Sequence, residues 1–411
     1  MLNWTGVKRY LKFFGPAWLV MLADMDASST IGAAETGAVF KYGLIWFMLL
    51  LVIPLYLIQE VSGRIGVATE KGLGEVIRDY YPRRTALFLT VPMVITDVET
   101  YTVEYLGIAI GVELLGLPIL ISLPIFYIFH ILIVTHRKYG TTETVLVGVS
   151  SVLIIGFIAT LIVRGIRPYN PVFISASPDF LFILAVNVGA VIMPFMLFFQ
   201  TSATAEKIVH VRSKNAETYE NEIDKSEKES KFKKTAMKSM RIETLFGAIV
   251  SEMLMIIVEM TMSGVTPTTD FASVSELAGA LSTIAGAFSP YLFGIGLIGA
   301  AFLALVVISL GSAWGFVEVL GLKRDRATLV YIVESFPALI VALVLPMTML
   351  INAVLTLLVL FVFVLIGPAI VMGLLARKKS LMKNFSLTGK SELAYWTSVM
   401  FVLSFGILAV I

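Results

Sequence analysis

Long apolar runs alternate with short polar connections along almost the whole chain of 411 residues. A bilayer core about 30 Å thick requires about 20 apolar residues per helix. On this basis we predict an all-α integral membrane protein. The eleven transmembrane helices are expected at roughly 13–38, 43–64, 84–114, 118–135, 142–163, 178–205, 242–263, 284–315, 327–346, 349–375 and 393–411.

The composition agrees with this prediction. Hydrophobic residues make up 58% of the chain and charged residues only 15%, whereas soluble domains average about 45–50% and about 25%. The chain has no cysteine, which excludes disulfides, thiol catalysis and cysteine metal sites. We expect no cleavable signal peptide, because the basic start leads into a long apolar segment without a clear cleavage site.

The distribution of lysine and arginine predicts the orientation. With the N-terminus in the cytoplasm, nearly all basic loop residues are cytoplasmic, and only Arg164 and Arg167 break the pattern. We therefore expect a multi-pass plasma-membrane protein with a cytoplasmic N-terminus and an extracytoplasmic C-terminus. The hydrophilic segment 206–241 carries mixed charges. It is expected to be a solvated cytoplasmic helix or linker, with a regulatory or lipid-contacting role for its basic end as the alternative.

Two of the predicted helices are interrupted by polar residues or proline. The first contains Asp24 and Asp26, and we expect it to break around Asp26 to Ser29 because Asp and Ser side chains compete for backbone hydrogen bonds. The sixth contains Pro194, which removes a backbone donor. Irregular backbone at membrane depth persists only where it is buried in protein or lines a watery cavity.

The two interruptions are five spans apart. This spacing predicts two five-helix repeats, residues 1–170 and 171–380, followed by an extra helix in residues 381–411. Because each repeat has an odd number of spans, the second must be inverted. Inverted repeats with paired broken helices are typical of secondary transporters, which bind their substrate at the breaks.

The groups at the breaks indicate a cation as substrate. Asp26 offers a carboxylate, Ser29 a hydroxyl, and the freed backbone around Ala23 and Ala190 offers carbonyl oxygens. Such hard ligands suit magnesium, calcium or manganese. Met193 could add a soft thioether, which would favour manganese, iron or cadmium; the alternative is a packing role.

Three segments carry a resemblance to a known family. The stretches GPAWLVMLADMD and AAETGAVFKYG resemble the first helix of the Nramp family of divalent-metal transporters, and GAVIMPFMLFFQTS resembles the sixth. The family motif Asp-Pro-Gly-Asn reads Asp26-Ala27-Ser28-Ser29 here, and Met-Pro-His reads Met193-Pro194-Phe195. The resemblance covers nearly the whole chain. It implies a LeuT-like fold of five plus five inverted helices, with metal bound by Asp26, Ser29, Met193 and the carbonyls of Ala23 and Ala190.

The departures from the family pattern concern proton coupling. In TDVETYTVEYLG, Glu104 matches the family glutamate, but Tyr101 stands where the family has an aspartate. Phe195 replaces the histidine, and Asp24 adds an acid beside the site. A glutamine of the tenth helix that can reach the metal falls on Asn352.

With these departures, the chain resembles the divergent Nramp-related magnesium transporters. The expected function is transport of Mg²⁺, and also Mn²⁺, without tight proton coupling, because magnesium retains part of its water and suits a wide, acidic site. A proton-coupled Mn²⁺ or Fe²⁺ symporter and a LeuT-like amino-acid symporter remain alternatives. We expect no enzyme, since Asp24 and Asp26 lie on one helix, and no cofactor or nucleic-acid partner. The expected partners are the metal ion and the bilayer.

Further acids fall within the spans. Glu60 and Arg64 are expected to pair at an interface. Glu252 and Glu259 are seven residues apart and share a helix face, and we expect them to pair with polar groups inside the bundle. His130 is expected to be packed in the interior.

Overall fold

The structure is a computed structural model. It describes residue 10 and residues 12–135, 139–214, 222–266, 271, 273–344 and 347–408, with backbone alone at 139–142, 222–226 and 347–352. Apart from an isolated bridge between Ser263 and Val265, the regular structure of these ranges is helical. The α-helices are α2 Pro16–Ala23, α3 Ala27–Phe40, α4 Ile45–Thr69, α5 Leu73–Tyr80, α6 Arg83–Leu114, α7 Ile119–Thr135, α8 Tyr139–Arg164, α9 Pro178–Val191, α10 Pro194–Lys214, α11 Glu222–Met262, α13 Val274–Ala285, α14 Ser289–Leu320, α15 Ala327–Val344, α16 Met347–Ala376, α17 Lys379–Met382 and α18 Lys390–Leu408, with 3₁₀ turns η1 Arg324–Arg326 and η2 Lys383–Phe385.

Within the described residues, nine helices are long and apolar enough to cross a membrane. One of these segments is α9 and α10 taken together. The other two predicted spans correspond to the broken pair α2 and α3 and to α7, which has 17 residues. The all-helical membrane fold is thus confirmed, and the count of eleven crossings stays a prediction.

Both predicted interruptions are present, and the first lies slightly earlier than expected. α2 ends at Ala23, and α3 begins at Ala27, so Ser28 and Ser29 are already helical. The physical reason is that Asp26 caps the new helix with its side chain, so the serines that follow start a helix instead of breaking one. α9 ends at Val191, and Pro194 is the first residue of α10, a position where proline loses no helical hydrogen bond.

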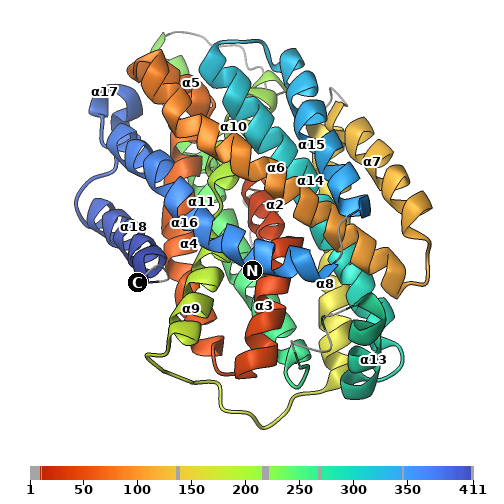
Figure 1. Cartoon of the computed structure of the whole chain (residues 1–411). Coiled ribbons are helices and arrows are strands. Elements are labelled where there is room, and N and C mark those ends of the chain that lie inside the picture. Colours follow the sequence, from red (N-terminus) through yellow and green to blue (C-terminus); the bar gives the residue numbers. More distant parts are fainter. Residues whose placement is uncertain are drawn as a thin grey trace, which may run out of the picture.

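The broken helices lie inside the bundle. In Figure 1, α2 and α3 are surrounded by other helices, while α7 and α18 lie at opposite edges. α3 packs against α9 and α11, and α14 packs against α6, α8 and α10. A glycine lets α9 and α16 pack closely against each other, because a Cβ on Gly189 of α9 would collide with the carbonyl oxygen of Leu358 in α16.

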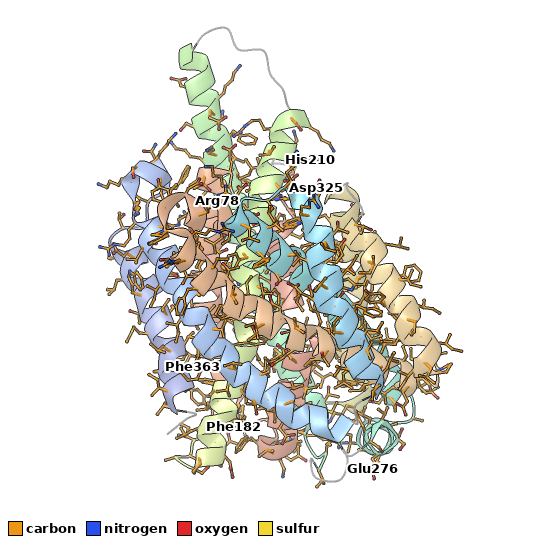
Figure 2. The ribbon with its side chains drawn as sticks, turned by 45° about the horizontal axis from the view of Figure 1, so that its top comes forward. Arg78, Phe182, His210, Glu276, Asp325 and Phe363 are labelled. Carbon is orange, nitrogen blue, oxygen red and sulfur yellow. The ribbon has the colours of Figure 1, made fainter. Side chains whose placement is uncertain are left out.

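The loops sort to two ends of the molecule. Arg78, His210 and Asp325 come from three predicted cytoplasmic connections and lie at one end, whereas Phe182 and Glu276 lie at the other, as Figure 2 shows. The predicted topology is therefore consistent with the arrangement of these connections, although the side of the membrane that each end faces stays a prediction.

The hydrophilic segment 206–241 is largely helical where it is described, since α10 continues to Lys214 and α11 starts at Glu222. It is not simply solvated. Glu70, just after α4, accepts hydrogen bonds from Arg212 and pairs with Lys233 at 2.6 Å. Burial raises the pKa of Glu70, but the hydrogen bonds and charges of these two residues outweigh burial and lower the pKa to about 2. These ion pairs hold the segment against the bundle.

Candidate cation site

Asp26 lies at the centre of the first break and starts α3. Its Oδ1 accepts hydrogen bonds from the backbone N–H of Ser29 and from the Ser28 hydroxyl, both at 2.7 Å. Its Oδ2 is buried and has no hydrogen-bond partner. One carboxylate oxygen therefore fixes the side chain at the helix N-terminus, and the other remains available to a ligand.

Glu104 reaches the same helix end from α6. Its Oε2 accepts the backbone N–H of Ala27 at 3.0 Å, and its Oε1 is buried without a partner. α6 comes this close because Gly107 has no side chain, since a Cβ there would collide with that of Ala27. Glu104, which the sequence predicts as a candidate cavity or proton-path acid in mid-span, therefore lies at the first break, and that role stays a prediction.

Two other predicted site groups contact each other across the breaks. The Ser29 hydroxyl donates a hydrogen bond to the Ala190 carbonyl oxygen at 2.9 Å, although the residues are 161 positions apart. Both residues are fully buried. A metal ion bound to the Ala190 carbonyl would therefore compete with the Ser29 hydroxyl, and the hydroxyl would be free to turn toward the ion.

The second break is enclosed by side chains without charge. Met193, Pro194 and Phe195 are buried. The backbone N–H of Met193 lies 3.4 Å from the sulfur of Met196, so a second thioether, which sequence reasoning missed, lies at this break. Phe195 cannot exchange a proton, and it occupies the position where the family motif has histidine.

Asp24 and Ala23 lie at the end of α2, at the other side of the break. The Oδ2 of Asp24 accepts a hydrogen bond from Ser251 of α11 at 2.8 Å, and its Oδ1 has no partner. The next residue of α11, Glu252, interacts electrostatically with Asp24. Sequence reasoning expected Glu252 to pair with polar groups, but both of its oxygens are buried without a hydrogen-bond partner.

The other predicted pairs behave as expected. Glu60 and Arg64 form an ion pair at 2.9 Å, and Arg241 joins them. Glu259 accepts the backbone N–H of Leu44 at 3.0 Å, next to the start of α4. The side chain of Asn352 lies outside the described residues, so its predicted role near the metal stays a prediction.

The first break is surrounded by a concentration of acidic side chains. Asp24, Asp26, Glu104 and Glu252 are at most 1% exposed, and each has at least one oxygen without a hydrogen-bond partner. Burying a carboxylate without compensation is very unfavourable. Within the described ranges, no three His, Cys, Asp or Glu side chains are grouped as metal ligands. A bound cation would therefore need hydroxyl or carbonyl oxygens to complete its shell.

A separate polar cluster lies between α6, α7, α14 and α15. His130 bonds the Tyr105 hydroxyl and the Ser309 hydroxyl, each at 2.7 Å. The Tyr101 hydroxyl donates to Ser309 at 3.1 Å and lies 3.5 Å from a carboxylate oxygen of Glu334. His130 is fully buried as predicted, but its contacts are polar.

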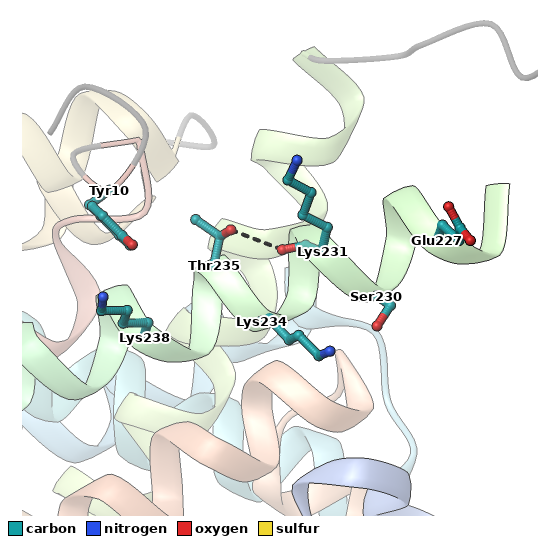
Figure 3. Close-up of a pocket in the computed structure, with 7 residues that line it drawn as sticks. All are labelled: Tyr10, Glu227, Ser230, Lys231, Lys234, Thr235 and Lys238. Carbon is teal, nitrogen blue, oxygen red and sulfur yellow. Dashed lines mark hydrogen bonds between the residues drawn. The ribbon is translucent and has the colours of Figure 1, made fainter. Parts of the chain in front are cut away.

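An open cavity beside the first turns of α11 is a poor candidate for this site. It measures about 600 Å³ and is lined by Lys231, Lys234 and Lys238 on successive turns of α11, with Tyr10 opposite (Figure 3). Glu227 also lines this cavity, but three lysines against one carboxylate leave a net positive lining that repels a metal cation. The buried breaks are therefore the better candidate for a cation site than this cavity.

The fold places the chain in a known structural class. It matches a manganese transporter from Eremococcus coleocola with a TM-score of 0.80 at 15% identity, over 100% of this chain and 88% of that chain. It also matches MhsT, solved in complex with L-phenylalanine, with a TM-score of 0.59 at 13% identity, over 97% of each chain. The fold is LeuT-like, as predicted.

Within that class, a model of the family described as natural resistance-associated macrophage protein-like (Nramp) matches residues 17–411, and the chain belongs to this family. It is similar to the divalent metal cation transporter MntH of Bacillus subtilis, 29% identical over 212 residues, or 50% of each protein. The MntH of Klebsiella pneumoniae is 30% identical over 202 residues, covering 47% of this chain and 49% of that protein. The chain spans about half the length of the curated relatives it matches.

Proposed function

We propose that this protein carries divalent metal cations across the membrane by alternating access at the two helix breaks. The observation that carries the proposal is Asp26, whose buried Oδ2 has no partner while its Oδ1 is fixed by the start of α3. Family membership supports the same substrate class, because the similar proteins are named divalent metal cation transporters. The proposed ligands are Asp26, Ser29, Met193 and the carbonyls of Ala23 and Ala190, with Asp24 and Asn352 beside them.

We further propose that Mg²⁺ and Mn²⁺ are the ions and that transport is not tightly coupled to protons. Hard oxygen groups dominate the first break, and Mg²⁺ favours such ligands. Phe195 stands at the second break where the family motif has a titratable histidine. Tyr101 stands in α6 where the family has an aspartate. Met193 is the softer group that supports Mn²⁺ as a second ion. The N-terminus is proposed to be cytoplasmic.

The test is metal uptake into liposomes that contain the purified protein, followed with an internal magnesium dye and a pH dye. Asp26→Asn removes the charge of an anionic ligand, and loss of one partner of a buried charge pair costs about 3 kcal/mol. It should lower uptake about 100-fold. Asp179→Asn is the matched control, because Asp179 is an exposed acid at the start of α9. Unchanged uptake by Asp26→Asn, in well-folded protein, would refute the site assignment.

A second candidate function is proton-coupled Mn²⁺ or Fe²⁺ symport. Buried acids of two helices favour it: Glu104 of α6 lies at the break, and Tyr101, one turn before it in α6, lies 3.5 Å from a carboxylate oxygen of Glu334 in α15. In the same liposomes, Mn²⁺ uptake with internal acidification and no Mg²⁺ response would select this candidate. Mg²⁺ uptake that follows the membrane potential without acidification would select the first.

A further inference from the structure

The break in the first helix has acidic groups on two sides. On one side, Asp26 and Glu104 share the N-terminus of α3. On the other side, Asp24 faces α11, where Ser251 donates to it and Glu252 follows. The first pair contains the proposed cation ligand. The second pair includes Glu252, which has no role in the transport site described above.

We propose that Asp24 and Glu252 form a second binding position for a divalent cation, occupied together with the position at Asp26. This inference rests on the proposed transport of divalent cations and extends it from one ion to two. Ser251 would complete the position with its hydroxyl oxygen.

The need for a ligand follows from the surroundings of these two side chains. Asp24 is 1% exposed and Glu252 is fully buried. Three of their four carboxylate oxygens have no hydrogen-bond partner, and the fourth accepts only from Ser251. In the part of the chain that the structure describes, neither carboxylate pairs with Lys, Arg or His within 4 Å. Asp24 and Glu252 interact electrostatically, and two ionised carboxylates in this setting repel each other strongly unless a cation lies between them.

The end of α2 adds a second, independent source of attraction. Asp24 is the C-cap residue directly after the last helical residue of α2, and its backbone N–H bonds back to the Val20 carbonyl. A helix C-terminus carries unsatisfied carbonyls and a partial negative charge, which favour cations. α11, which contacts Asp24 through Ser251, therefore lies beside a helix end that already attracts positive charge.

The charge balance selects a divalent ion. Two carboxylates carry two negative charges, which one divalent cation neutralises and one monovalent cation does not. The available donors are carboxylate, hydroxyl and carbonyl oxygens, the set that Mg²⁺ and Mn²⁺ accept. Two such ions can occupy neighbouring positions in one protein site, as in two-metal centres.

The experiment measures how many Mn²⁺ ions the purified full chain binds, by equilibrium dialysis, and whether the bound ions are close, by the dipolar broadening of their EPR spectrum. The wild type should bind two ions with a coupled signal. Glu252→Gln and Asp24→Asn should each bind one ion with an uncoupled signal, because the affinity of the second position falls about 100-fold.

Glu259→Gln is the matched control, since Glu259 is a buried acid seven residues along α11 that already accepts a backbone N–H. It should still bind two ions. A wild type that binds one ion, lost in Asp26→Asn, would overturn the second position and leave the proposed function standing. Two ions retained in Glu252→Gln would also overturn it. Failure of the wild type to bind or transport any metal would instead refute the proposed function.

Discussion

The N-terminus of α2 depends on a carboxylate from another helix. Glu243 of α11 accepts the backbone N–H of Gly15 at 2.7 Å and that of Trp18 at 2.8 Å through one oxygen. Gly15 has no side chain with which to cap the helix itself. Glu243→Ala should therefore detach this end of α2 from α11 while leaving the cation ligands in place.

The magnitude follows from the two hydrogen bonds. Each contributes about 1 kcal/mol net, so their loss shifts the balance between attached and detached α2 by about 2 kcal/mol. This corresponds to about a 30-fold larger detached population. If α2 moves during alternating access, Glu243→Ala should increase the population of the conformation that is open at this end of the protein.

The lack of cysteine in the chain makes the assay simple. Thr204 lines a small cavity beside Pro16 and Ala17 and is 5% exposed, so Thr204→Cys is a reporter for detachment of α2. Its rate of reaction with a maleimide should rise about 30-fold when Glu243→Ala is added. Glu227→Ala, an exposed acid on the same helix, should leave the rate unchanged. An unchanged rate in folded Glu243→Ala protein would refute the idea that this carboxylate holds α2.

Three further predictions address other contacts. Ser29→Ala removes a proposed ligand and should raise the half-saturating Mn²⁺ concentration about tenfold in the uptake assay, for a loss of about 1.4 kcal/mol; an unchanged value would exclude the hydroxyl as a ligand. Gly189→Ala inserts a methyl group against the Leu358 carbonyl and should lower stability by about 1–3 kcal/mol, seen as a lower thermal midpoint. The depressed pKa of Glu70 means that its ion pairs stabilise the fold above about pH 4.5 and lose that effect as the pH falls toward about 2. Glu70→Gln should therefore lower the midpoint at pH 6 and have a smaller effect at pH 3.

The sequence was most informative where polar residues interrupt apolar runs. Asp26 and Pro194 stand out against their neighbours, and both mark real breaks. Glu104 could be placed near the site through its family motif. The position of the first break was less accurate, because the same aspartate that interrupts α2 also caps α3.

Contacts between segments that are far apart in the sequence could not be predicted from the sequence in the same way. Periodicity gives the face of a helix but not the residue that this face meets. Glu252 and Glu259 look alike in sequence, yet Glu259 accepts a backbone N–H and Glu252 has no hydrogen-bond partner. The short helices α5 and α13 lie between or at the edges of the predicted spans, and each is too short to cross a membrane.

The hydrogen bond between Ser29 and Ala190 has a consequence for how a carrier resets. A carbonyl that holds an ion must find another partner when the ion leaves, or it stays bare inside the membrane at a cost of several kcal/mol. In the described structure the Ser29 hydroxyl is that partner. The exchange of one partner for the other would keep the energy of this carbonyl similar in the loaded and the unloaded carrier. The carbonyl would then need no companion ion while the empty carrier returns.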